Sequence, residues 1–133
     1  YPIFDLKNWK KDLPWYVTCL EEVIIKVLKD YGIKAGRKPK YRGVWVGDKK
    51  IAAIGIAVAK WITMHGFAFN VKVNKDHFNL INPCGITEFS VASLDDFVKD
   101  VNFDEVMEKV KDNFSMVFDA NFKEASRKWL EGN

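Results

Sequence analysis

The chain has 133 residues, of which 48% are hydrophobic and 14% aromatic, which is enough for one well-packed core and excludes a disordered or fibrous chain. No apolar run reaches the roughly 18 residues that mark a membrane-spanning helix. With 21 Lys and Arg against 18 Asp and Glu, the net charge of +3 is too small to indicate nucleic-acid binding. The sequence opens at Tyr1 rather than Met, so we expect it to be part of a longer gene product.

The first predicted element is a helix that follows Asp12. Apolar residues recur at helical spacing over 17–31, and Gly32 stands where a C-terminal cap belongs. Cys19 lies inside this amphipathic stretch, so we interpret it as a small packing residue. The basic stretch 32–40 then interrupts the apolar periodicity, and we expect it to be a loop.

After this loop the period of the pattern changes to two. Residues 44–56 are rich in β-branched side chains around a Gly47-Asp48 turn, which predicts a β-hairpin. A third strand is predicted over 61–71. Glycine is a poor strand former, so Gly66 inside this strand indicates close approach of a ligand or of another backbone.

The remaining pattern predicts helices towards the C-terminal end of the chain. A short helix is expected over 76–81, ahead of an irregular loop at 82–85. Asn102 resembles a helix N-cap, and an apolar face at helical spacing follows over 106–118. Strands in the middle of the chain with helices at both ends predict a single α+β domain over 1–133.

The two cysteines do not make a disulfide framework, and neither has a second ligand at zinc-finger spacing. A reducing compartment is therefore the default, although a bridge between Cys19 and Cys84 stays open. Cys84 lies between Pro83 and Gly85, so it is either an ordinary free cysteine or a nucleophile. A nucleophilic thiol needs a nearby cation or base that lowers its pKa.

Three residues are candidates for that partner. His77 is expected in a polar, exposed turn, and His65 is either a structural hydrogen-bonding group or a base. Lys50 opens an apolar strand, so its ammonium lies either at the edge of the core, partly desolvated, or at a solvated hairpin end. The residues alone leave these alternatives open.

Three ordered segments resemble consecutive motifs of one enzyme family, the octanoyltransferases of lipoate biosynthesis. They are 49–55 (KKIAAIG), 63–71 (TMHGFAFNV) and 81–86 (INPCGI). Shorter matches at 1–3, 15–16, 21–24, 43–45 and 91–94 extend the resemblance over most of the chain. The resemblance implies an α+β fold like that of the biotin and lipoate protein ligases, a mixed β-sheet with packed helices.

This resemblance also implies an activity. Such enzymes transfer an octanoyl or lipoyl group from acyl carrier protein to a lysine of lipoyl domains. The acceptor domains belong to the E2 subunits of 2-oxoacid dehydrogenases and to the glycine cleavage H protein. No cofactor, ATP or metal is implied. The implied location is the cytoplasm, or an organellar matrix in a eukaryote.

The family's site residues fall on particular positions of this sequence. Its acyl-accepting cysteine falls on Cys84, and the lysine that lowers the pKa of that thiol falls on Lys50. Its acyl-pocket segments fall on six residues: Ala53, Ile54, Gly55, Gly66, Phe67 and Ala68. The residue types agree with this assignment of the acyl pocket, because small residues on neighbouring strands leave room for an aliphatic chain.

One departure from the family is large. The family places two glycine-rich segments upstream of the tyrosine-proline step that here is Tyr1-Pro2. We therefore expect this chain to lack the usual N-terminal part and to be the C-terminal portion of the family domain. A fragment, or one subunit of a split enzyme completed by a companion chain, would both fit.

Other functions stay open at this level. An ATP-dependent lipoate or biotin ligase of the same fold would use Lys50 to bind an adenylate, and Cys84 would be incidental. A non-catalytic partner that binds acyl carrier protein would need neither, while a Cys-His protease could use only His65 as its base. The basic residues of 34–42 would steer an acidic carrier protein or simply form a solvated loop.

Overall fold

The structure is a computed structural model that describes residues 1–74, 76 and 90–123. Its elements follow one another as η1 (Leu6–Asn8), α1 (Leu13–Asp30), β1 (Gly36–Lys38), β2 (Tyr41–Val46), β3 (Lys49–Ala59), β4 (Ile62–Phe69), β5 (Ser90–Val91), η3 (Leu94–Asp96) and α3 (Phe103–Phe118). The predicted α+β class is confirmed. Of the helix expected over 76–81, all but Asp76 lies outside the described residues.

Both long helices begin as the sequence predicts. The Asp12 carboxylate accepts a hydrogen bond from the Trp15 N–H at 2.9 Å, and this bond lowers the pKa of the Asp12 carboxyl. The Asn102 side chain accepts one from the Glu105 N–H at 3.1 Å. Helix α1 ends at Asp30, and Gly32 follows with a φ of +75°, as expected for a left-handed residue after a helix.

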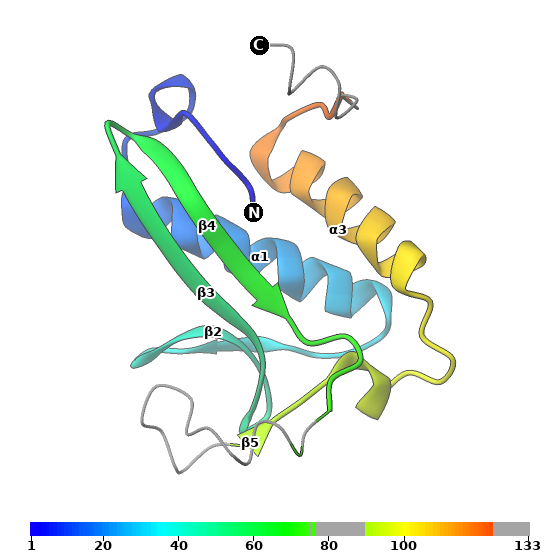
Figure 1. The fold of residues 1–133 in the computed structure, drawn as a ribbon. Coiled ribbons are helices and arrows are strands. Elements are labelled where there is room, and N and C mark those ends of the chain that lie inside the picture. The colour runs from blue at the N-terminus through cyan, green and yellow to red at the C-terminus, as the bar shows by residue number, and fades with distance from the viewer. Residues whose placement is uncertain (75, 77–89, 124–133) are drawn as a thin grey trace.

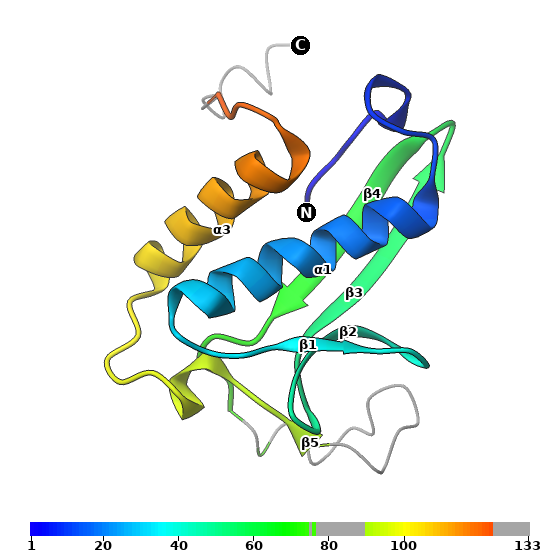
Figure 2. The same ribbon diagram turned by 180° about the vertical axis from the view of Figure 1, so that it is seen from behind.

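The sheet is mixed, as the resemblance implied. Strands β1 to β4 follow one another in space in the order of the chain, and each pairs antiparallel with the next. Strand β5 pairs parallel with the first two residues of β3. Helix α1 crosses one face of the β3–β4 hairpin, and the other face is turned towards the viewer in Figure 1 and away in Figure 2.

The N-terminal segment lies along the free side of β4, between that strand and α3 (Figure 1). Asp5 forms an antiparallel bridge with Ile62. The Thr63 N–H donates to the Phe4 carbonyl at 2.8 Å, and the Phe4 N–H donates to the Thr63 hydroxyl at 2.8 Å. This segment therefore extends the sheet beyond β4.

Two apolar clusters make the core, and α1 contributes to both. One cluster packs Ile24 and Leu28 against β2, β3 and the start of α3. The other joins Tyr16 to aromatic rings from both ends of the chain, with the Phe4 and Phe118 ring centroids 4.8 Å apart. In the described part of the chain no helix is both long and apolar enough to cross a membrane.

The basic stretch 32–40 differs from its prediction as a plain loop. Within it β1 forms a short strand that pairs with β2. Arg37 and Lys38 are not free charges there, because Arg37 contacts Glu21 and Glu22, and Lys38 contacts Asp48 at 3.0 Å. Partners that are distant in the sequence supply the order that the local pattern lacks.

Candidate functional site

Strands β3 and β4 bring the six predicted pocket residues together. They form three successive cross-strand pairs: Ala53 with Ala68, Ile54 with Phe67, and Gly55 with Gly66. Because side chains alternate along a strand, Ile54 points to the helix side and packs in the Tyr16 cluster, while Ala53 and Gly55 are exposed on the other face. The register of one hairpin thus assembles the whole set.

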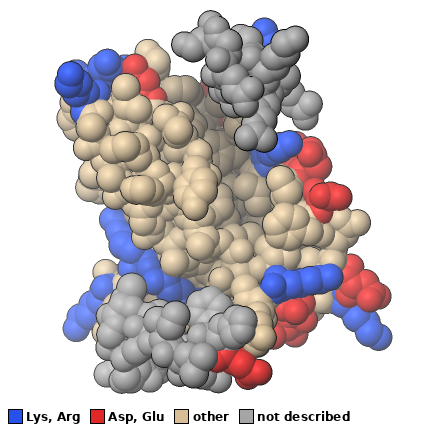
Figure 3. Space-filling model, in the orientation of Figure 1, with Lys and Arg blue, Asp and Glu red and all other residues tan. Residues whose placement is uncertain are grey.

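These six residues line a groove of about 520 Å³ together with Tyr1 and His65. The volume lies within the range of about 300–1,000 Å³ that small-molecule sites occupy. Uncharged atoms cover the centre of this face, and the Lys and Arg side chains gather at its edges (Figure 3). The groove suits an aliphatic chain rather than a charged ligand. Tyr1 was not predicted, because no local pattern shows that the N-terminal segment reaches β4.

The two glycines of the groove are glycine for different reasons. Gly66 has a φ of +155°, and a Cβ there would lie 2.5 Å from Pro2 Cδ, so both the backbone and the N-terminal segment require its lack of a side chain. Gly55 lies outside the left-handed region, and a Cβ there would meet no atom within 4 Å. Packing does not require glycine at position 55; its effect is to keep the groove open.

His65 lies next to Gly66 in β4 with a φ of +64°, a conformation that non-glycine residues rarely adopt. Its side chain is exposed at the groove, and it makes no hydrogen bond to the residues that the structure describes. This position does not support the alternative in which His65 is a structural hydrogen-bonding group. His77, the other histidine, lies outside the described residues.

Lys50 lies at the other end of β3, where three strands meet. It pairs with Trp45 of β2 on one side and with Val91 of β5 on the other. Its side chain is half-buried, and Nζ lies over the Trp45 ring, 5.7 Å from the centroid. This is the partly desolvated alternative rather than the solvated hairpin end, while a role of Lys50 in catalysis stays a prediction.

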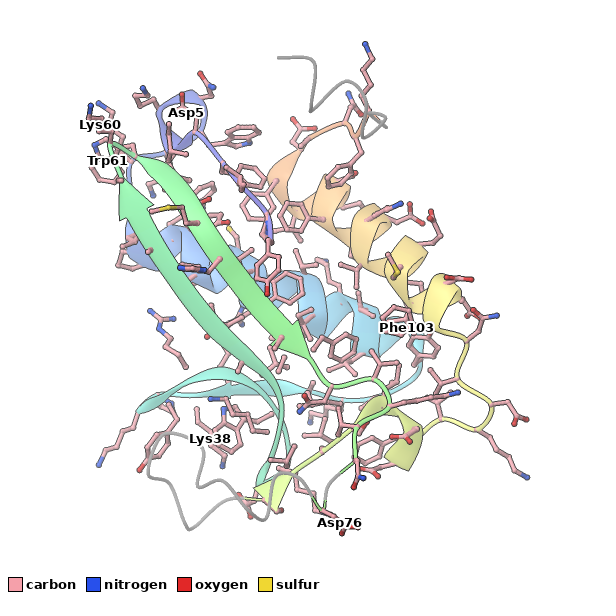
Figure 4. The ribbon with its side chains drawn as sticks, in the orientation of Figure 1. Asp5, Lys38, Lys60, Trp61, Asp76 and Phe103 are labelled. Atoms are coloured by element: carbon pink, nitrogen blue, oxygen red, sulfur yellow. The ribbon has the colours of Figure 1, made fainter. Side chains whose placement is uncertain are left out.

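The two ends of the β3–β4 hairpin, the turn and the end that carries Lys50, lie on opposite sides of the molecule (Figure 4). Lys60 and Trp61 form the turn at one end, both with positive φ, and Lys38 lies at the opposite end near β2. Lys38 Nζ lies over the same Trp45 ring, 5.3 Å from its centroid. The Lys50 end is therefore rich in cations, and the groove lies between it and the turn.

Of the two cysteines, the structure describes only Cys19. It is half-buried and free, and it packs against the Tyr16 cluster, as predicted for a packing residue. Burial raises the pKa of its thiol, and the nearby Glu22 carboxylate adds to the rise. Cys84 lies outside the described residues. The described part of the chain contains no cluster of three His, Cys, Asp or Glu side chains that could hold a metal ion.

The fold matches that of known ligases. A lipoate-protein ligase A bound with ATP superposes with a TM-score of 0.73 at 21% identity, over 90% of this chain and 53% of the ligase. A biotin protein ligase from Aquifex aeolicus gives a TM-score of 0.68 at 17% identity, over 88% of this chain and 47% of that chain. At such identities the likeness concerns the fold alone, and it confirms the fold that the resemblance implied.

Sequence comparisons show the family. The lipoyl protein ligase A/B catalytic domain profile matches residues 1–115, so the chain belongs to that family. It is 55% identical over 121 residues to an octanoyltransferase of Clostridium kluyveri and 58% identical over 124 residues to one of Thermoanaerobacter sp. strain X514. These matches cover 91% and 93% of this chain but 52% and 54% of the relatives, so the chain spans about half their length.

Proposed function

We propose that this chain belongs to an octanoyltransferase. Such an enzyme would move an octanoyl or lipoyl group from acyl carrier protein to a lysine of a lipoyl domain. The observation that carries the proposal is the uncharged groove formed by three cross-strand pairs of β3 and β4. The 55% and 58% identities to proteins named octanoyltransferase favour this transfer over other reactions of the same fold.

The proposed first step forms a thioester on the enzyme. Cys84 thiolate attacks the carbonyl carbon of the octanoyl thioester, a new C–S bond forms, and the C–S bond to the carrier protein breaks. The departing carrier-protein sulfur takes a proton from the Lys50 ammonium and leaves as a thiol, so Lys50 is neutral before the second step. Lys50 is the proposed cation that stabilises this thiolate. Strand β5, which begins six residues after Cys84 in the sequence, pairs with Lys49 and Lys50. This short separation in sequence between Cys84 and a strand beside Lys50 supports the proposal.

The proposed second step releases the acyl group to the acceptor. The amine of an acceptor lysine attacks the acyl-enzyme carbonyl, an amide forms, and the bond to Cys84 breaks. Lys50 would take or relay the proton that the attacking nitrogen loses. The groove at Ala53–Ala68 to Gly55–Gly66 would hold the aliphatic chain through both steps.

Electrostatics bears on the proposed partners. Acyl carrier proteins and lipoyl domains are typically acidic, and the basic stretch 34–42 lies near the Lys50 end of the sheet. Arg37 and Lys38 already contact carboxylates of this chain, so their positive charge is partly neutralised. Steering by this region would therefore be weaker than the sequence alone implies.

The second candidate is an ATP-dependent ligase, favoured by the fold of the ligases that superpose on this chain. It would activate a free acid with ATP and would need no thiol. A non-catalytic partner that binds acyl carrier protein is the third candidate. A covalent intermediate on Cys84 that forms without ATP would distinguish the transferase from both.

The test is to incubate the protein with octanoyl-carrier protein, without ATP or acceptor. It is run with the 133-residue chain alone and with that chain joined to the part of the Clostridium kluyveri relative that it does not match. In the joined protein we expect an octanoyl adduct on Cys84. Hydroxylamine should remove this adduct, and an unlipoylated lipoyl domain should accept the octanoyl group from it. Cys84→Ser should abolish the cycle, and Cys19→Ser should not. An adduct elsewhere, or one that requires ATP, would overturn the proposal.

A further inference from the structure

Glu21 is a buried charge in the middle of α1. Glu21 is only 1% exposed. It lies on the helix face that otherwise packs apolar side chains into the core. Moving a carboxylate out of water is costly unless partners compensate its charge and its hydrogen bonds. The partners of Glu21 therefore explain why this position is not apolar.

Both carboxylate oxygens of Glu21 are engaged by residues of other elements. Oε2 accepts a hydrogen bond from Arg37 Nε in β1 at 2.8 Å. Oε1 accepts one from the backbone N–H of Gly43 in β2 at 3.2 Å, and Arg42 Nη1 lies 3.7 Å from it. One side chain of the helix thus fixes the backbone of β2 at Gly43.

The Lys50 side chain packs against Gly43. Its φ is +130°, which favours glycine, and a Cβ at this position would lie 2.6 Å from Lys50 Cε and 3.5 Å from Lys50 Nζ. The Lys50 stem therefore passes directly over Gly43, and its ammonium lies above the Trp45 ring. A shift of the Gly43 backbone would move the lysine.

We infer that Glu21 is a positioning residue that sets the place of the Lys50 ammonium through Gly43. The Glu21 carboxylate anchors the Gly43 N–H, and the glycine leaves room for the Lys50 stem. The importance of this placement for acyl transfer rests on the proposed function of Lys50. The placement itself follows from the contacts and is testable without any activity.

Glu22 provides a matched control on the same helix. It contacts Arg37 as well, with Arg37 Nη2 donating to Glu22 Oε2 at 3.0 Å, but it makes no hydrogen bond to Gly43 and its side chain is 38% exposed. Glu22→Gln therefore removes a negative charge beside the same arginine. It differs from Glu21→Ala in leaving the hydrogen bond from the Gly43 N–H to Glu21 intact.

The first measurement is NMR of the 133-residue chain with isotope-labelled methyl groups placed on the lysine amines. A group above an aromatic ring is shifted upfield, so the Lys50 signal reports its place over Trp45, and Lys38 over the same ring is the internal reference. Lys50→Arg and Lys38→Arg assign the two signals. We expect Glu21→Ala to remove most of the Lys50 shift. Glu21→Gln should keep more of the shift, because its amide oxygen still accepts from the Gly43 N–H. Glu22→Gln should leave the shift unchanged.

The second measurement is the kinetics of acyl transfer. It uses the protein that forms the octanoyl adduct, either the 133-residue chain or the joined protein. A lysine displaced by about 1 Å should lower kcat about 10- to 100-fold in Glu21→Ala, while KM for the carrier protein changes little. Glu21→Gln should restore part of that loss, and Glu22→Gln should behave as the parent protein. Each kcat is calculated for the folded fraction of the variant, measured by circular dichroism, because a loss of folded protein would lower the apparent kcat in the same way.

An unchanged Lys50 signal in a folded Glu21→Ala protein would overturn the inference. So would an equal loss of the signal in Glu22→Gln. If Glu21→Ala does not fold, Glu21→Met decides in its place, because methionine has a similar length but offers the Gly43 N–H no strong hydrogen-bond acceptor. A parent protein that forms no octanoyl-Cys84 would instead overturn the proposed function, and it would leave the NMR result as it is.

Discussion

The two ends of strand β3 have opposite chemistry. From Ala53 onwards the strand and its partner β4 offer small and apolar residues that border an uncharged groove. Around Lys50 the same strand lies among charges, with Arg37, Arg42 and the buried Glu21 nearby. One continuous strand therefore connects an apolar groove to a cationic centre, and the fixed rise of a strand sets their separation at roughly 3.3 Å per residue.

Different interactions hold the two ends of β3 in place. The groove depends on backbone pairing and on missing side chains, so its shape follows from strand register. The Lys50 end depends on a buried carboxylate with several partners, so its geometry depends on charges from α1, β1 and β2. Substitutions at the two ends should therefore fail in different ways, which the following changes test.

The largest effect is expected at the cationic end. Lys50→Met removes the proposed cation, so the pKa of the Cys84 thiol should rise and transfer should slow by about 10²- to 10⁴-fold. The measurement is the rate of iodoacetamide labelling at Cys84 against pH, read by peptide mapping. Cys19, whose thiol pKa is raised by burial, is the slow reference within the same protein. An unchanged Cys84 profile would remove Lys50 from the activating role.

A stability effect is expected next, at the groove end. Gly66→Ala places a side chain at a φ of +155° and against Pro2, which should cost about 1–3 kcal/mol of the free energy of unfolding. Gly55→Ala is the matched control, since the site is open, and it should be neutral or stabilise by about 0.4–1 kcal/mol. Urea unfolding measures both. Equal losses in the two variants would show that the two glycines do not differ as the geometry indicates.

A change of specificity without loss of stability is expected at the same place. Gly55→Val fills part of the groove, so it should favour a four-carbon over an eight-carbon acyl donor by about 10-fold relative to the parent protein. Gly36→Val, at an equally open glycine of β1 outside the groove, is the control. Competition between the two donors gives the ratio directly. A Gly55→Val protein with the parent's ratio would exclude the groove as the acyl site.

The smallest effect concerns the support beneath the groove. Tyr16 is buried under β4, and burial raises the pKa of its hydroxyl although its bond to the Thr63 hydroxyl, at 3.3 Å, acts in the opposite direction. Above about pH 10 the unfolded chain loses the tyrosine proton while the folded chain keeps it, so stability should fall as the pH rises.

Tyr16→Phe separates this contribution from others. The variant should lose about 0.5–1.5 kcal/mol at neutral pH through the missing hydrogen bond. Its stability should then fall less steeply between about pH 9 and about pH 11, a window of about one unit on either side of the ordinary tyrosine pKa. Tyr31, whose pKa burial and Glu105 also raise, remains in both proteins and cancels in the comparison. Identical slopes with pH would contradict the assignment to Tyr16.

Elements whose signals are local can be predicted from the sequence. The period of α1 and its Asp12 cap, the change to period two before β2, and the Gly47-Asp48 turn all act between near neighbours, so the pattern alone predicts them. The six pocket residues came from resemblance to a family, with support from the small residues in the two strands. Their predicted role in binding is still to be tested.

How the helices, the strands and the N-terminal segment contact one another follows only from the tertiary structure. The short strand β1 could not be predicted, because its order comes from carboxylates on α1 and at the β2–β3 turn that lie far away in the sequence. Tyr1 reaches the groove only because the N-terminal segment pairs with β4. A charged residue on the apolar face of α1 is the one sequence signal that could have pointed to Glu21. Its partners depend on long-range packing, since a buried charge is stable only where the fold brings donors to it.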